Sequence, residues 1–260
     1  MRQAETKSPG LPRRMLILIG AFVASFQVVA LAPASLLPLL GDFKNAGVRY
    51  EAAEGRLWGG TLRGVAIKGV SLGDIAFELA PLSLLTGSPS FTYRVTDGAL
   101  SGGGRARLSF FGETKLTDTR LIFNLGAATQ FAFMDAPLEG SLRLETARLV
   151  INKQGCAEGE VRMMTDVLQA PARQLGAAGF DLAGAGRCIA NDFVAELAGE
   201  GAEGSATMVV RITPGLDYAF SATAAPTRKE VAAALEAFGF QRQAGGLTTA
   251  ARGVIKAIGS

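Results

Sequence analysis

A long apolar segment near the N-terminus constrains this chain more than any other feature. From Met15 to Leu40 no charged side chain interrupts the sequence. A helix needs about 20 apolar residues to cross the hydrocarbon core of a bilayer, and the segment supplies them before Pro33. The sequence therefore predicts one transmembrane anchor over residues 15–34. Its apolar side chains are Met15, Leu16, Ile17, Leu18, Ile19, Phe22, Val23, Phe26, Val28, Val29 and Leu31.

The charges before this segment predict its orientation. Arg13 and Arg14 directly precede it, and the tail carries four basic residues against the single acid Glu5. Lys and Arg next to a membrane segment favour the cytoplasmic side. We therefore expect a basic cytoplasmic tail over 1–14, a linker over 35–45 and an exported domain over 46–260.

A cleaved signal peptide is the alternative interpretation. Ala30-Leu31-Ala32 has the small-x-small form of a cleavage site. The apolar run is longer than the core of a usual signal peptide, and Pro33 would directly follow the cut. Both features favour retention of the anchor, and in either case the larger part of the chain acts outside the cytoplasm.

Charge and composition exclude several classes of function. The chain has a formal net charge of +3, and the tail before Met15 accounts for it, so the exported part is neutral by count. A nucleic-acid-binding domain would cluster Lys and Arg on its body, and no nucleic-acid partner is expected. The chain contains no histidine, which removes the usual catalytic base and the commonest metal ligand. We expect no enzyme, no metal site and no cofactor.

The chain has two cysteines, Cys156 and Cys188. Disulfides persist in oxidising compartments such as the bacterial periplasm, so we expect these cysteines to be bridged. The bond would close a loop of about 32 residues and contribute roughly 3.5–4 kcal/mol. Two buried free thiols are the alternative.

Apolar and polar residues alternate with period two through most of the exported part. Examples are Ile75-Phe77-Leu79, Leu121-Phe123-Leu125, Phe193-Ala195-Leu197 and Met208-Val210-Ile212. Such alternation is typical of half-buried antiparallel strands. The predicted fold is mainly β: an antiparallel body after a single N-terminal helix, either one curved, repetitive sheet or a sandwich, because both share this pattern.

Helices are predicted at few places. Pro81 to Leu85 favours a short turn of helix or a loop that ends at Gly87, and Asp166 to Leu175 is a second candidate despite Pro171. The strongest is Arg228 to Phe238, with Thr227 and Glu230 as a capping box and Gly239 as a left-handed C-terminal cap. Its apolar stripe is expected to pack on the sheet.

A glycine-rich segment around the only tryptophan carries the most distinctive motif. It contains Gly55, Leu57, Trp58, Gly59 and Gly60. Gly59 and Gly60 permit a tight turn, and Trp58 can bury a large ring beside it. The alternative is an ordinary core tryptophan next to a β turn.

Together with its surroundings, this segment resembles protein N of the type II secretion system. The tail, the single span, the Gly55–Gly60 segment soon after it, and the approach Leu182-Ala183-Gly184-Ala185-Gly186-Arg187-Cys188 all match the layout of that family. The region after Phe240 departs from it. The resemblance implies a non-enzymatic accessory or scaffold subunit, anchored in the bacterial inner membrane with a periplasmic interaction domain. Its partners would be the inner membrane and the other inner-membrane platform subunits.

A more distant resemblance, to AsmA-like membrane-anchored β proteins, implies a periplasmic lipid-binding or lipid-transfer module as the alternative. Its apolar groove would be lined by Phe91, Phe110, Phe111, Phe131 and Phe133. An enzyme of the cell envelope is the third hypothesis, supported only by scattered acids that turns explain: Asp97, Asp118, Glu139 and Asp192.

Overall fold

The computed structural model describes residues 31–36, 48–67, 70–109, 112–126, 132–133, 136–137, 139–174, 176–215, 217–237 and 239–254. The predicted tail with Arg13 and Arg14, and the predicted anchor as far as residue 30, lie outside these ranges and stay predictions. Within the described ranges, no helix combines the length and the apolar character that crossing a bilayer requires.

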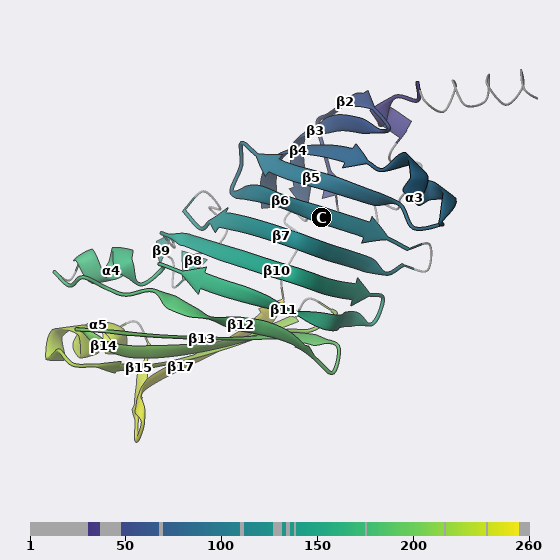
Figure 1. Cartoon of the computed structure of the whole chain (residues 1–260). Helices are drawn as coiled ribbons and strands as arrows, with labels where there is room; N and C mark the ends of the chain where they lie inside the picture. Colours follow the sequence, from purple (N-terminus) through teal and green to yellow (C-terminus); the bar gives the residue numbers. More distant parts are fainter. Residues whose placement is uncertain are drawn as a thin grey trace, which may run out of the picture.

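One antiparallel sheet of 15 strands forms the body (Figure 1). Its order is β1-β3-β4-β5-β6-β7-β10-β11-β12-β13-β14-β15-β17-β16, and β2 also pairs with β3. Most neighbours in the sheet are therefore neighbours in sequence. The strands are β1 (Val48–Arg49), β2 (Ala52–Arg56), β3 (Gly59–Ile67), β4 (Val70–Leu79), β5 (Ser90–Thr96), β6 (Leu100–Leu108), β7 (Thr114–Asn124), β10 (Ser141–Asn152), β11 (Gly155–Thr165), β12 (Leu182–Ile189), β13 (Asp192–Gly201), β14 (Gly204–Ile212), β15 (Asp217–Pro226), β16 (Gln241–Gln243) and β17 (Gly246–Val254).

The prediction of an antiparallel β body is confirmed. Of the two predicted arrangements, the body forms one continuous sheet rather than a sandwich. Strands β4 to β11 are seen face-on in Figure 1, whereas β13 to β17 are seen nearly edge-on. The sheet therefore twists and bends along its length, as right-handed strand twist requires. A separate pair, β8 (Ala132–Phe133) and β9 (Ala136–Pro137), completes the strands.

Alternation gives the sheet two chemically different faces. In β14 the even residues are half-buried and the odd ones exposed. Residues that are paired across neighbouring strands point to the same face of a sheet. The pairing therefore aligns one row of residues on this face across twelve strands. This row defines the apolar face: Leu62, Ile75, Val95, Gly102, Leu121, Leu144, Met163, Gly184, Leu197, Met208, Ala222 and Thr249.

The adjacent row points the other way and defines the polar face. It reads Thr61, Ala76, Arg94, Gly103, Arg120, Glu145, Arg162, Ala185, Glu196, Val209, Ser221 and Ala250. Exposed cross-strand ion pairs lie on this face, such as Arg120 with Glu145 and Arg187 with Glu160. Pairs of this kind contribute little to stability individually.

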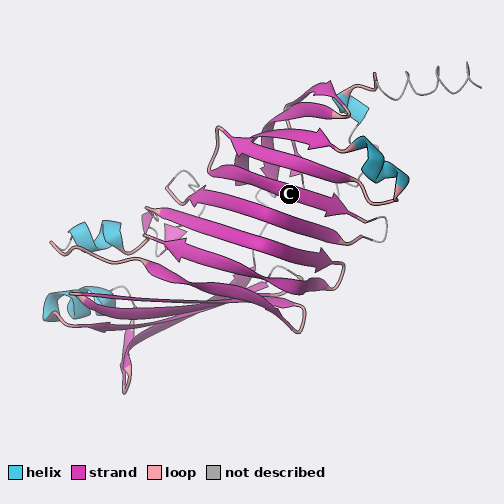
Figure 2. Ribbon diagram, in the orientation of Figure 1, coloured by secondary structure: helices cyan, strands magenta, loops and turns pink. Residues whose placement is uncertain are grey.

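Short helices lie at the strand ends (Figure 2). They are the 3-10 helix η1 (Ala34–Leu36) and the α-helices α3 (Pro81–Leu85), α4 (Gln169–Gln174) and α5 (Lys229–Ala237). The predicted segment from Pro81 to Leu85 is helical throughout, and the other two predicted segments are helical over most of their length. Helix α5 contacts β15 and β17, so it lies against the sheet. None of its described residues is buried, and packing through its apolar stripe stays a prediction.

The two predicted caps of α5 have different outcomes. Gly239 has a φ of 83°, its N–H donates to Glu236, and that of Phe240 donates to Leu235, which is the predicted left-handed cap. The predicted capping box is wrong. The N–H of Thr227 donates to the Glu203 carbonyl and its hydroxyl to the Ala202 carbonyl, while Glu230 pairs with Arg228.

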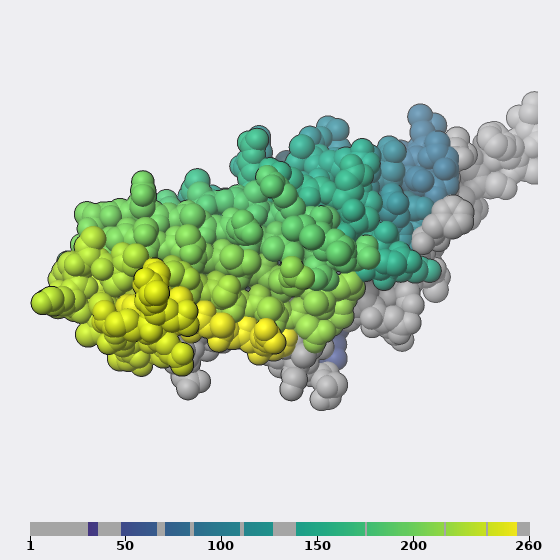
Figure 3. Space-filling model, turned by 90° about the horizontal axis from the view of Figure 1, so that it is seen from below, coloured from purple at the N-terminus to yellow at the C-terminus, as the bar shows by residue number. Residues whose placement is uncertain are grey.

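The most buried cluster lies in the C-terminal half, at Leu182, Ala195 and Leu197. The residues packed around it are Met163, Leu168, Phe180, Phe193, Ala206 and Met208. Viewed from below, the side chains of this half form the near surface of an elongated molecule (Figure 3).

The described N-terminal residues pack against the opposite end of the sheet. The N–H of Leu57 donates to the Ala32 carbonyl at 2.8 Å, and Pro33 forms a bridge with Arg56. Ala34 is fully buried. Residues 31–36, which span the predicted boundary between anchor and linker, thus adjoin strand β2. Leu31 itself is exposed.

Candidate functional site

The apolar face of the sheet is the largest feature with a candidate function. Of its row, Val95 and Leu197 are buried, whereas Leu62, Leu121, Leu144 and Met163 are only half-buried. Within the described ranges, the only other sheet is the two-stranded pair β8–β9, which is too small to cover this face. Large apolar surfaces left accessible mark binding sites. The face can therefore accept an apolar ligand or partner along the sheet.

The predicted aromatic lining is placed only in part. Phe91 lies on the apolar face, paired with Leu79 and Ala106, and is half-buried. Phe110, Phe111 and Phe131 lie outside the described residues, as does the side chain of Phe133, whose backbone pairs with Ala136 in β8–β9. The groove lining as predicted therefore stays untested apart from Phe91.

The apolar face carries further aromatic residues that are not part of the predicted groove lining. Phe77 pairs with Tyr93, Phe123 with Leu142, and Phe220 with Val210. Their alternation was visible in the sequence. Only the register between strands reveals that they share one surface.

A line of hydroxyl groups interrupts the apolar face near its middle. The side chains of Tyr93 and Thr119 are hydrogen-bonded at 3.2 Å, and Thr119 faces Thr146 across β7 and β10. The Thr119 hydroxyl donates to the Thr117 carbonyl and that of Thr146 to the Glu160 carbonyl. Irregularities in the strand pairing lie close by, in β10 and in β6. The two threonine hydroxyls donate to carbonyl groups beside these irregularities.

Burial changes the acidity of the tyrosine in this line. Desolvation raises the pKa of Tyr93 above its usual 10.0, and the hydrogen bond with Thr119 offsets part of that rise. The phenol is therefore held neutral, as a hydrogen-bonding group within the apolar face.

The tryptophan motif forms the turn between β2 and β3. The turn residues are Leu57 and Trp58, and Gly59 and Gly60 begin β3. This corrects the prediction that the two glycines make the turn. Gly60 is instead required by close approach, because a Cβ there would overlap the Glu54 carbonyl, while Gly55 takes a positive φ of 91°. Leu57 is buried and Trp58 half-buried.

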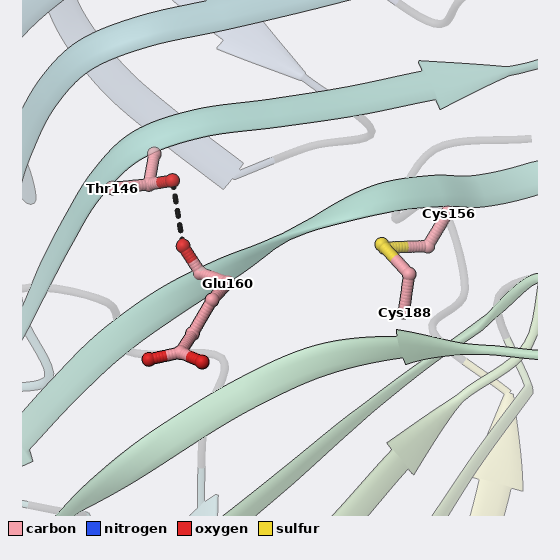
Figure 4. The surroundings of a disulfide bond; sticks show 4 residues. All are labelled: Thr146, Cys156, Glu160 and Cys188. Atoms are coloured by element: carbon pink, nitrogen blue, oxygen red, sulfur yellow. Dashed lines mark hydrogen bonds between the residues drawn. A yellow bond between two sulfur atoms is a disulfide. The ribbon is translucent and has the colours of Figure 1, made fainter.

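The predicted disulfide joins Cys156 at the start of β11 to Cys188 near the end of β12, with their Cα atoms 5.1 Å apart (Figure 4). The ladder between β11 and β12 runs only from Glu160 with Arg187 to Thr165 with Leu182. The disulfide therefore joins the two strands beyond the end of this ladder, where the N–H of Cys156 also donates to the Asn191 carbonyl at 2.9 Å.

In the described chain, the acids that the enzyme hypothesis named lie in turns, in a connecting segment or in ion pairs. Asp97 lies in the turn between β5 and β6, Asp118 pairs with Arg105, and Asp192 pairs with Arg211. Among the described residues, no three acids or cysteines are grouped as metal ligands would be. A hollow of about 440 Å³ over β15, β16 and β17 is lined mainly by hydroxyl and amide side chains, including Ser221, Thr223 and Gln241.

Comparison with known proteins identifies the family. A comparison with curated proteins found no match, and neither did a comparison with solved structures. The family model for type II secretion system (T2SS) protein N matches residues 46–250, which span nearly the whole sheet. The chain therefore belongs to the type II secretion system protein N family.

Proposed function

We propose that this protein is a non-enzymatic scaffold subunit of the type II secretion system. In this proposal, residues 15–34 anchor it in the inner membrane, residues 1–14 stay in the cytoplasm, and residues 46–260 form a periplasmic interaction domain. The family match over residues 46–250 carries the proposal, because the matched part is the β body itself.

The edge of the sheet supports a scaffold role. β17 pairs with β15 along most of its length but with β16 only at Gly246, Leu247 and Thr248. Its remaining residues, as far as Val254, have no second strand beside them within the described chain. An open edge offers unpaired backbone groups to a partner strand.

Affinity purification from native membranes in mild detergent tests the scaffold. We expect the inner-membrane platform subunits of the secretion system to copurify with the full-length protein. A matched form, with residues 1–34 replaced by a cleavable signal peptide, separates the β body from the anchor. Retention of the partners by this form assigns the contacts to the body, and their loss assigns them to the anchor. Absence of platform subunits from both preparations, with normal secretion in cells lacking the protein, would contradict the proposal.

Lipid binding is a second candidate function, favoured by the half-buried apolar row from Leu62 to Ala222. Native mass spectrometry of gently purified protein should then detect bound lipid. Replacing Leu121 and Leu144 by Gln, on the apolar face, should remove that lipid. Replacing Ile122 by Gln is the control, because Ile122 is next to Leu121 in β7 but is exposed on the polar face. The lipid should stay bound to this variant. Protein without lipid in the unsubstituted form would exclude this candidate.

A further inference from the structure

The large apolar side chains exposed on this protein are unevenly distributed. Eight are exposed among the described residues, and three of them, Ile122, Met164 and Val209, lie within strands on the polar face. The other five lie at strand ends or in the adjoining turns and helix. They are Leu31 (60% exposed), Leu82 (77%), Leu108 (39%), Ile151 (40%) and Ile189 (51%).

These five residues lie along one rim of the sheet, here called the apolar rim. The backbone contacts of the strand ends connect them in steps. Trp58 is bonded to Leu79, which is followed by α3 with Leu82, and Leu79 pairs with Phe91. Further along the rim, Leu108 pairs with Thr114, and Thr114 with Ile151.

The last step reaches Ile189 through the disulfide. Ile151 pairs with Cys156, which is bonded to Cys188, the residue before Ile189. Figure 1 shows α3 and the turn between β10 and β11 on the same side of the sheet, with α4 and α5 on the other side.

The chain enters the domain at this rim. Leu31 directly precedes Ala32, whose carbonyl bonds Leu57 beside Trp58. In the sequence, Leu31 follows the uncharged apolar run that begins at Met15. The end of the rim at Leu31 and Trp58 is therefore the part of the described body that directly adjoins this run.

Basic side chains accompany the apolar ones. Arg107 and Lys115 lie directly opposite each other where β6 and β7 meet the rim. Lys153 lies exposed in the turn between β10 and β11, and Arg56 ends β2 beside Pro33. The acids along this rim include Glu113, in the turn between β6 and β7, and Asp192, which is opposite Ile189 and paired with Arg211. Apolar and basic side chains together are what surfaces that lie on anionic bilayers carry.

We propose that the apolar rim rests on the surface of the bilayer from which the chain emerges. The strands then stand away from the membrane, and α4 and α5 lie at the distal side. The inference rests on the proposed anchor for its direction of approach, and it adds a second, independent contact with lipid. A bilayer suits the rim better than one protein partner, because the apolar side chains come singly from successive strand ends.

Quenching of tryptophan fluorescence by lipid tests the inference, because Trp58 is the only tryptophan and lies on the rim. Full-length protein is reconstituted in vesicles of phosphatidylethanolamine and phosphatidylglycerol that contain brominated lipid. Trp58 is replaced by Phe, and single tryptophans are introduced as Leu82→Trp or Ile189→Trp on the rim. The matched control is Ala202→Trp, in the exposed turn between β13 and β14 at the opposite strand ends.

We expect severalfold stronger quenching at positions 82 and 189 than at position 202. Replacing phosphatidylglycerol by phosphatidylcholine should weaken the rim quenching, because the attraction of Arg107, Lys115 and Lys153 is lost. Quenching that is independent of anionic lipid would overturn the role of these basic residues. Equal, weak quenching at all three positions would overturn the rim contact.

Extraction with alkaline carbonate separates this inference from the proposed anchor. Protein that resists extraction but shows no rim quenching retains the anchor and refutes the rim contact. Protein that is extracted refutes the anchor. Quenching after its addition to vesicles would then still support the rim as a lipid-binding surface, and no quenching would refute both. Loss of copurifying subunits from Leu82→Ser, with no quenching at the rim, would assign this surface to protein partners.

Discussion

Close approach between strands makes glycine necessary at position 184. A Cβ on Gly184 would overlap the carbonyl oxygen of Glu196 in β13, a backbone atom that cannot move without disturbing the ladder. We expect Gly184→Ala to lower the free energy of unfolding by about 1–3 kcal/mol, as overpacking does. Gly59→Ala is the control, because its Cβ would meet its nearest atom at 3.8 Å. It should change stability by less than about 0.5 kcal/mol in urea unfolding. Equal losses in both variants would contradict the close approach.

Tyr93 predicts a dependence of stability on alkaline pH. Because burial raises its pKa in the folded state above the usual 10.0, its contribution is complete below pH 10.0 and is lost as the pH rises through the folded-state pKa. Tyr93→Phe removes the hydrogen bond to Thr119 and should cost about 0.5–1.5 kcal/mol at neutral pH. That difference from the unsubstituted protein should shrink above pH 10.0. Urea unfolding of both proteins over this range measures it, and a constant difference would show that the phenol titrates normally.

At the scale of elements, the disulfide should stabilise the region where β11 and β12 separate. It closes a loop with a sequence separation of 32, and removing it should lower the free energy of unfolding by about 3.5–4 kcal/mol. Cys156→Ser and Cys188→Ser should each cost about as much as the double variant, because either one breaks the same bond. Hydrogen exchange should rise first at the start of β11 and the end of β12. A double variant that loses twice as much as each single one would indicate separate packing roles instead.

Sequence patterns predicted the type of these elements better than their relations. Alternation such as Phe193-Ala195-Leu197 is a property of one strand and indicated β structure directly. Likewise, the end of α5 is predicted by a local signal, the glycine at position 239 that directly follows the helical segment. The apolar face depends on how twelve strands pair. A shift of one residue in any ladder would turn the apolar side chains of that strand to the opposite face. Phe91 and the other predicted groove residues are proposed from their aromatic type alone. Phe77 and Phe220 are assigned to the apolar face only by the pairing between strands. The sequence does not distinguish a turn at Leu57 and Trp58 from one at Gly59 and Gly60, because glycine is itself a typical turn residue.

At the scale of the whole molecule, a single bent sheet distributes its stability unevenly. Neighbouring strands contact mainly each other, as in repeat proteins, so opening can begin at an edge and spread. The most buried cluster and the disulfide both lie between β11 and β14. β2 and β16 lie at the margins of the sheet and carry no buried residue. The middle of the C-terminal half should therefore hold the fold, while the margins stay available for partners.

Native-state hydrogen exchange measures this distribution. Backbone amides should exchange slowest in β12 and β13, and fastest in β2 and β16. Leu197→Ala, in the buried cluster, should lower the free energy of unfolding by about 2–5 kcal/mol because it leaves a cavity. Val209→Ala, on the exposed polar face of the adjacent strand, should change it by about 0.5 kcal/mol or less. Uniform exchange in all strands would mean that the sheet unfolds as one unit. Partner binding at an edge would then have to draw on the stability of the whole sheet rather than on a margin that opens by itself.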